Sequence, residues 1–197
     1  DDAVVPWEDR LLPLLILMGV FWGGMLLPAT SIINEKQKRT MSALLVTPAS
    51  PGDIFMSKAL MGVIISLTMG IVVLLINRVF GDQTWLIIGV LGLGAIMSSQ
   101  FGLVLGLYSR DITTLFATIK TMGVLLYAPA IVYMFPQLPE WVGRFFPTFY
   151  IVQPIVALSQ RGAEWADINT EFYILVGLIV VFGLGLGVLL RRRYGSL

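Results

Sequence analysis

Residues 34–53 read NEKQKRTMSALLVTPASPGD, and this segment separates two long apolar runs, Leu11–Ile33 and Ala59–Asn77. Its charged residues lie mainly in the first half, and its second half contains the turn-forming sequence TPASPG. An apolar run of about 20 residues can cross a bilayer as a helix, whereas a cluster of charges is costly inside hydrocarbon. The pattern therefore predicts two membrane-spanning helices joined by a polar segment at one membrane face.

The composition of the whole chain agrees with this interpretation. The 197 residues are 57% hydrophobic and only 13% charged, with a mean hydropathy of +0.87, whereas soluble domains carry about 25% charged residues. The absence of Cys and His excludes disulfides, cysteine nucleophiles and histidine metal sites or general bases. A net charge of +1 gives no reason to expect nucleic acid as a partner.

Five runs are long and apolar enough to span a bilayer, and the fourth of them contains one charge, Lys120. They are residues 11–33, 59–77, 84–109, 112–135 and 172–190. We therefore expect an all-α integral membrane protein, folded as a single transmembrane domain over residues 1–197.

The basic residues set the expected orientation. One set of connections carries most of them: Lys36, Lys38, Arg39, Lys58, Arg110, Arg191, Arg192 and Arg193. The other set has Arg10, Arg78, Arg144 and Arg161, together with most of the acids and with Trp7, Trp85, Trp141 and Trp165 near the boundary. Because positive residues favour the cytoplasm, we expect the N-terminus outside and the C-terminus inside.

The segment before the last span, residues 136–170, is too long for a simple loop and is interrupted by Pro136, Pro139, Pro147 and Pro154. Its apolar part, Thr148–Ser159, is too short to cross a bilayer. We expect short helices at the outer leaflet, serving either as the lid of a pathway or as a structural plug.

The charged segment itself predicts a short helix over about residues 35–47. Asn34 and Gln37 form a capping-box pattern, and Thr47-Pro48 should end the helix. Ser50 should cap the next helix, with Pro51 in its first turn and Asp53 reaching back. Met41, Leu44 and Leu45 would form one apolar face, which could rest on the inner leaflet or bind a partner protein.

The sequence of Glu35–Pro48, EKQKRTMSALLVTP, resembles the coupling-helix region of permease subunits of ABC transporters of the type-2 exporter class. The following Ala49-Ser50-Pro51, the later Lys58 and the segment Phe146–Tyr150 are also similar to that family. The family has six spans with both ends in the cytoplasm. The chain resembles its spans two to six, so that the first span is expected to be absent from this sequence.

The resemblance implies three partners. They are an ATPase subunit, a second permease copy that is identical or related, and the lipid bilayer. The sequence contains no GxxxxGK[ST] phosphate-binding loop, so we expect no enzyme activity, catalytic residue, metal or cofactor in this chain, and ATP-Mg on the partner. Docking to the ATPase would involve Glu35, Lys36, Lys38, Arg39, Met41, Leu44 and Leu45.

Polar and small residues inside the spans suggest two further roles. Candidate pathway-lining residues are Gln100, Lys120, Tyr127 and Tyr133, although Lys120 could instead extend to the inner surface and the polar run at Gln100 could bond helices together. Closely spaced Gly19, Gly23 and Gly24 favour tight helix packing, either within the bundle or at a dimer face.

The expected function is that of a membrane-spanning permease of an ATP-driven exporter in the plasma (inner) membrane of a prokaryote, with a pathway formed by a dimer. The alternatives are a passive channel or membrane scaffold, and an integral membrane enzyme acting on lipids. An enzyme would need clustered acids, His or Cys near a membrane face, and the inner face offers only Glu35, Asp53 and Asp111.

Overall fold

The computed structural model describes residues 7–40, 50–81, 83–135 and 139–194, and within these residues it is helical, without strands. Its elements are α1 (Trp7–Gln37), α3 (Pro51–Ile76), α4 (Thr84–Tyr108), α5 (Ile112–Met134), the 3-10 helix η1 (Glu140–Phe145), α6 (Phe149–Gln160) and α7 (Trp165–Tyr194). Five of them, α1, α3, α4, α5 and α7, are long and apolar enough to cross a membrane. The predicted all-α membrane fold with five spans is confirmed.

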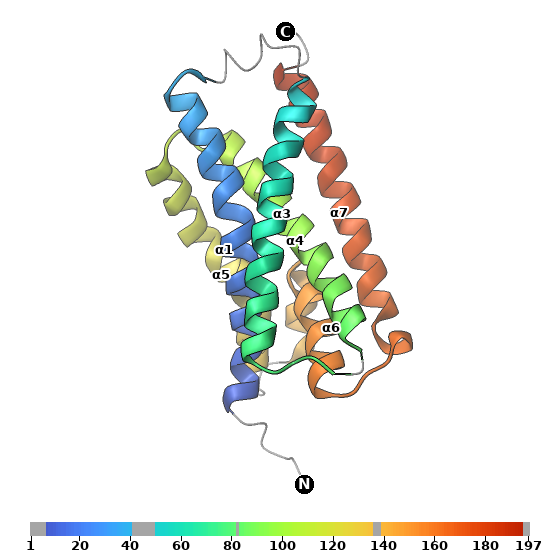
Figure 1. The fold of residues 1–197 in the computed structure, drawn as a ribbon. Coiled ribbons are helices and arrows are strands. Elements are labelled where there is room, and N and C mark those ends of the chain that lie inside the picture. The colour runs from blue at the N-terminus through green and yellow to red at the C-terminus, as the bar shows by residue number, and fades with distance from the viewer. Residues whose placement is uncertain (1–6, 41–49, 82, 136–138, 195–197) are drawn as a thin grey trace.

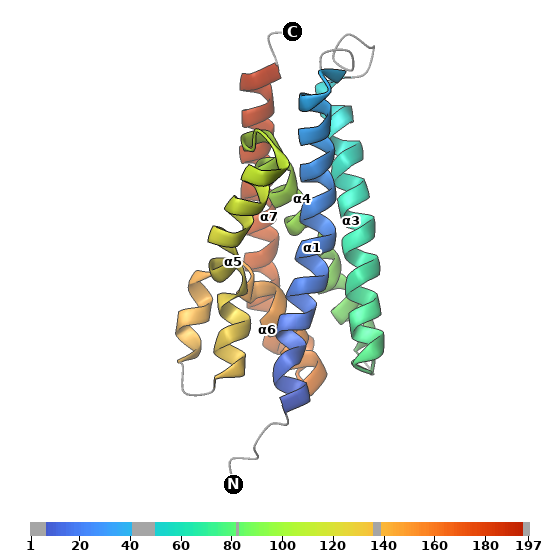
Figure 2. The same cartoon turned by 90° about the vertical axis from the view of Figure 1, so that its left-hand side faces the viewer.

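The long helices run side by side along the bundle, with the start of α1 and the end of α7 at opposite ends of it (Figure 1). Three helices, α1, α3 and α4, pack most closely on one another. Leu17, Phe21 and Met25 of α1 and Leu91 and Met97 of α4 are fully buried in their core. Seen from the side, α3 and α5 lie on opposite sides of α1, α7 runs behind next to α4, and α6 lies near the start of α1 (Figure 2).

Small residues allow this close approach. A methyl group on Gly102 of α4 would lie 2.5 Å from the Met25 carbonyl oxygen of α1, and one on Gly24 would lie 1.8 Å from Ser98 Oγ. Ser98 Oγ donates a hydrogen bond to the Val20 carbonyl oxygen of α1 at 3.1 Å. The Ser98 hydroxyl thus bonds α4 to α1, and bonding helices together was one of the two roles expected for the polar run near Gln100.

The Gly19 and Gly23 backbones of α1 lie against α3. Methyl groups at these positions would lie 3.1 Å from the Val73 side chain and 3.3 Å from the Ser66 Cα atom. These glycines therefore serve packing within one chain, and a role in a dimer face is a prediction that this arrangement leaves open.

Three of the spanning helices, α1, α3 and α7, are longer than their apolar runs, and for α3 a cap sets the start. As predicted, Ser50 caps α3: its Oγ accepts a hydrogen bond from the Asp53 amide at 3.2 Å, while Asp53 Oδ2 accepts one from the Ser50 amide at 3.1 Å. Both orphan donors are satisfied, so α3 begins at Pro51, before its apolar run.

The predicted cap at Asn34 is wrong, because α1 continues through Asn34 to Gln37. The Lys38 amide still donates to the Asn34 carbonyl oxygen at 2.9 Å, and Arg39 then adopts a left-handed conformation with φ of 57°. A left-handed residue after the last turn is a common way to end a helix. Most of the predicted 35–47 helix, residues 41–49, lies outside the described residues.

A short helix, α6, follows the proline-rich segment, as the apolar run Thr148–Ser159 suggested. Thr148 is buried, and its hydroxyl donates to the Leu126 carbonyl oxygen of α5 at 2.8 Å. The start of α6 is thereby fixed against α5. Its position at an outer leaflet stays a prediction, since it depends on the orientation.

Candidate functional site

The ends of α1, α4 and α7 and the starts of α3 and α5 gather at one end of the bundle, the end that carries the C-terminus (Figure 1). We call it the charged end, because these segments contain most of the basic residues: Lys36, Lys38, Arg39, Lys58, Arg110, Arg191 and Arg192. The predicted sorting of connections between the two ends of the bundle therefore holds, although the side of the membrane on which each end lies is not fixed by the fold.

Lys36 joins the end of α1 to the end of α4. Its ammonium nitrogen donates hydrogen bonds to the carbonyl oxygens of Gly106 and Leu107 at 2.6 Å each, and to that of Ser109 at 3.2 Å. Carbonyls in the last turn of a helix lack partners within the helix and carry its negative dipole end. A cation in this position satisfies them and stabilises the end of α4.

Glu35 joins α1 to α3 through an ion pair with the Lys58 ammonium. Lys58 also donates to Ser31 Oγ of α1 at 2.8 Å, and the two charged side chains are only 21% and 11% exposed. The second carboxylate oxygen of Glu35 is buried and accepts no hydrogen bond within the part of the chain that the structure describes. The pair is thus partly desolvated and holds the end of α1 against the beginning of α3.

The predicted docking residues therefore fall into two groups. Glu35 and Lys36 are half-buried and bonded within the chain, whereas Lys38 and Arg39 are exposed beyond the end of α1. Met41, Leu44 and Leu45 lie outside the described residues. Sequence reasoning missed the role of Ser31, although its spacing of four residues from Glu35 places both on one helix face toward α3.

The beginning of α5 is ordered by Asp111. Its Oδ1 accepts a hydrogen bond from the Thr114 amide at 2.7 Å, as expected for an N-cap. The hydrogen bond from this backbone amide is the main cause that holds the pKa of Asp111 below its ordinary value. Asp111 is therefore explained by helix capping.

The four candidate pathway residues lie in three places. Lys120 is exposed on α5, and Tyr127, seven residues later and therefore on the same side of the helix, is half-buried beside Trp22 of α1. Tyr133 stacks on Phe149 of α6, with ring centroids 6.5 Å apart.

The fourth candidate, Gln100, lies between α4 and α7, where its Nε2 donates to the Ile179 carbonyl oxygen at 3.2 Å. Only Lys120 and Tyr127 therefore share a surface. That surface is formed by α1 and α5, which face the viewer in Figure 2.

An apolar groove of about 520 Å³ continues this surface between α1 and α3. It is lined by Met18, Gly19, Trp22, Gly23, Leu26, Leu27, Ile65 and Met69. The exposed side chains of Met18 and Trp22 thus connect the face of α5 with the groove.

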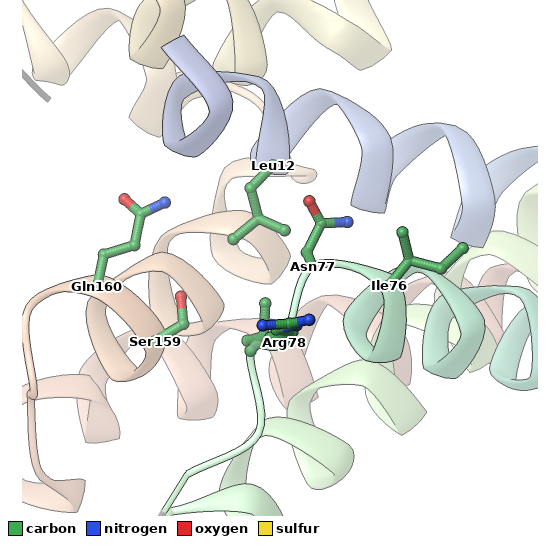
Figure 3. Close-up of a pocket in the computed structure, with 7 residues that line it drawn as sticks. Leu12, Ile76, Asn77, Arg78, Ser159 and Gln160 are labelled. Atoms are coloured by element: carbon green, nitrogen blue, oxygen red, sulfur yellow. The ribbon is translucent and has the colours of Figure 1, made fainter. Parts of the chain in front are cut away.

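A polar cavity of about 380 Å³ lies at the opposite end of the bundle (Figure 3). It is lined by Leu12 of α1, by Ile76 at the end of α3, by Asn77, Arg78 and Val79 after α3, and by Ser159 and Gln160 of α6. Arg78 is left-handed (φ 53°), and the Val79 amide donates to the Leu74 carbonyl oxygen at 3.1 Å, which is a Schellman ending. Because two helices end here, their negative dipole ends account for a cation at this place.

The arrangement of helices, cap and charged end can now be compared with known proteins. No curated protein and no solved structure matches the chain. The sequence profile of the ABC-2 family transporter proteins matches residues 8–188, a range that contains α3, α4, α5 and α6 entirely and most of α1 and α7. The chain is therefore a multi-pass membrane permease component of a transporter, and it belongs to the ABC-2 family of transporter proteins.

Proposed function

We propose that this permease is one half of an ATP-driven exporter, in which two copies form the translocation pathway and separate ATPase subunits bind ATP-Mg. The observation that carries the proposal is the family match over residues 8–188. It is supported by the charged end, where Glu35 and Lys36 bond α1 to α3 and α4. The positive charge of this end supports a cytoplasmic location in the plasma membrane of a prokaryote.

The segment 34–53 is the proposed contact with the ATPase. Lys38 and Arg39 are exposed beyond the end of α1, and Leu44 and Leu45 would fill an apolar groove on the partner. Glu35, Lys36 and Met41 complete the proposed docking region, but the bonds of Glu35 and Lys36 to α3 and α4 suit them to transmitting a movement. A push on the segment would then displace three helices together.

The surface of α1 and α5 is the proposed wall of the pathway. It presents Lys120 and the side of Tyr127 outward, and the apolar groove beside Trp22 extends it toward α3. A charged side chain on a helix within the membrane usually faces a water-filled cavity or a partner chain rather than lipid. A second copy facing this surface would enclose such a cavity.

Co-purification with a co-expressed ATPase tests the docking proposal. Replacing Leu44 and Leu45 by Asp, or Lys38 and Arg39 by Glu, should abolish capture of the ATPase by the purified permease. The matched control is Arg144→Glu in η1, which changes an exposed charge at the opposite end and should leave capture intact.

Full capture by both folded docking variants would contradict the proposed contact. Flux of solutes through liposomes containing the permease alone, without ATP, would instead favour a passive channel. Lipid turnover by the purified chain without ATP would favour a membrane enzyme.

A further inference from the structure

Lys120 is a cation on the exposed face of α5, within a helix that crosses the membrane. It lies eight residues after Ile112, the first residue of α5, which corresponds to about 12 Å along the helix axis. The turn between α4 and α5 itself stops short of the ends of α1 and α7 (Figures 1 and 2). The Lys120 ammonium is therefore well below the charged end.

The length of the side chain does not remove this depth. Helical side chains point back toward the N-terminus of their helix, which for Lys120 means toward the charged end. A lysine stem is on the order of 6 Å long, so it covers roughly half of the distance to Ile112. The ammonium group consequently remains inside the membrane-spanning part of the bundle.

Nothing in the described part of the chain neutralises this charge. The structure has no ion pair or hydrogen bond at the Lys120 side chain within residues 7–40, 50–81, 83–135 and 139–194. By contrast, Lys36 and Lys58, which lie nearer the charged end, are both bonded. An unpaired ammonium facing hydrocarbon is unfavourable, so the surface at Lys120 requires water or an anion.

The exposed face of α5 is divided along its length. The half nearer the charged end is mixed and holds the one cation, whereas the other half is apolar: the first contains Ile112, Thr113, Thr114, Phe116, Ala117, Lys120 and Thr121, and the second contains Val124, Leu125 and Ile131. Val124 and Leu125 are 68% and 54% exposed. Next to this face, α1 contributes the exposed Met18 and Trp22. The surface thus offers one cation followed by a continuous apolar strip.

We propose that the α1–α5 surface binds an anionic amphiphile as the transported substrate, with its carboxylate or phosphate group at Lys120 and its apolar part along Val124, Ile131 and Trp22. This inference rests on the proposed function, because it assigns the substrate class of the proposed pathway. Charge complementarity selects the acidic group, and the direction from Lys120 to Val124 fixes the orientation of the bound molecule. A neutral or cationic amphiphile would leave the ammonium unpaired.

The first test measures binding and does not depend on the ATPase. A full-length variant that keeps Trp22 as its single tryptophan is placed in vesicles of zwitterionic lipid, and quenching by a brominated fatty acid is compared with quenching by its methyl ester. The acid should bind at least about tenfold more tightly than the ester, since a hydrogen bond to a charged group adds roughly that factor. Lys120→Gln should remove the difference, and Lys120→Arg should keep it.

The control is Lys38→Gln, which removes an exposed cation at the charged end and should leave the preference for the acid unchanged. Equal binding of acid and ester by the wild type would overturn the assignment, as would an unchanged preference in Lys120→Gln. The proposed function fails if no ATPase binds the permease, whereas the substrate assignment fails if acid and ester bind equally. This measurement needs only the permease, so it distinguishes the two failures.

The second test separates a substrate from a bilayer lipid. In the complex with the ATPase, the fatty acid should stimulate ATP turnover, the alkylamine of the same chain length should not, and Lys120→Glu should reverse this preference. Displacement of the fatty acid by phosphatidylglycerol, without stimulation of turnover by either compound, would assign Lys120 to a bilayer lipid. That result would overturn the proposal that the anion is transported.

Discussion

The ion pair between Glu35 and Lys58 can be measured by a double-mutant cycle. The variants are Glu35→Gln, Lys58→Met and the double substitution, each of which removes the charge with little change in side-chain length. The two side chains are 21% and 11% exposed, so the pair lies between a surface pair and a buried one. Exposed pairs contribute about 0.2–1 kcal/mol, whereas breaking a buried pair costs about 3–5 kcal/mol.

We therefore expect a coupling free energy of about 1–2 kcal/mol between Glu35 and Lys58. Lys58→Met should cost more than Glu35→Gln, because it also removes the hydrogen bond to Ser31 Oγ. The free energy of unfolding would be measured by tryptophan fluorescence in mixed detergent micelles. A coupling free energy below about 0.3 kcal/mol would show that the pair does not hold α1 against α3.

The same variants distinguish two roles of Glu35 in ATPase binding. If Glu35 acts through Lys58, both single substitutions should weaken ATP-driven transport while leaving capture of the ATPase intact. If Glu35 contacts the ATPase directly, Glu35→Gln should weaken capture and Lys58→Met should not. Direct contact would refute the division of the docking segment into exposed and internally bonded residues.

Three other outcomes can be measured directly. Gly102→Ala should destabilise the bundle by about 1–3 kcal/mol in thermal unfolding, because the methyl group meets the α1 backbone. Gly92→Ala on the same helix meets open space and should be neutral or stabilising by up to about 1 kcal/mol. The pKa of the Asp111 carboxyl is lowered in the folded state, so the wild type should be more stable than Asp111→Asn above about pH 4. Unfolding measured as a function of pH should show this advantage disappear as the pH falls through the lowered pKa. Distances between spin labels should change on ATP binding between α1 and α5 but not between α1 and α3.

Local signals explain how much of the fold could be predicted from the sequence. The spans follow from apolar length, and the caps at Ser50 and Asp111 follow from polar side chains that reach an amide three residues ahead. The cap at Asn34 was predicted by the same rule and is wrong. There the helix gains more from continuing its backbone hydrogen bonds to Gln37 than from ending at a cap.

The candidate site was less predictable, because its contacts join distant parts of the chain. Lys36 reaches carbonyl groups 70 to 73 residues away, and Glu35 pairs with a residue 23 positions away. A pattern of charges in one segment cannot distinguish an exposed docking residue from one bonded to a neighbouring helix. For Lys120 the sequence showed a charge within a spanning segment, which is energetically costly in a membrane. The fold added that the side chain is exposed on the outer face of α5.

These contacts define which helices can move as one body in the proposed transport cycle. Glu35 and Lys36 bond α1 to α3 and α4, and the same three helices are packed through glycines such as Gly102. The bonds of both residues thus connect α1 with α3 and α4 at the charged end. ATP-driven movement of the docking segment should therefore carry α1, α3 and α4 together and shift them against α5.

Because the sequence contains no cysteine, introduced cysteine pairs can test this movement without background labelling of this chain. Gln37 of α1, Met56 of α3 and Thr113 of α5 are exposed near the charged end and suit this purpose. The Gln37–Met56 distance should stay constant when ATP binds the partner, and the Gln37–Thr113 distance should change. If both distances changed equally, the ionic contacts would not define a rigid unit, and Glu35 and Lys36 would have only a local stabilising role.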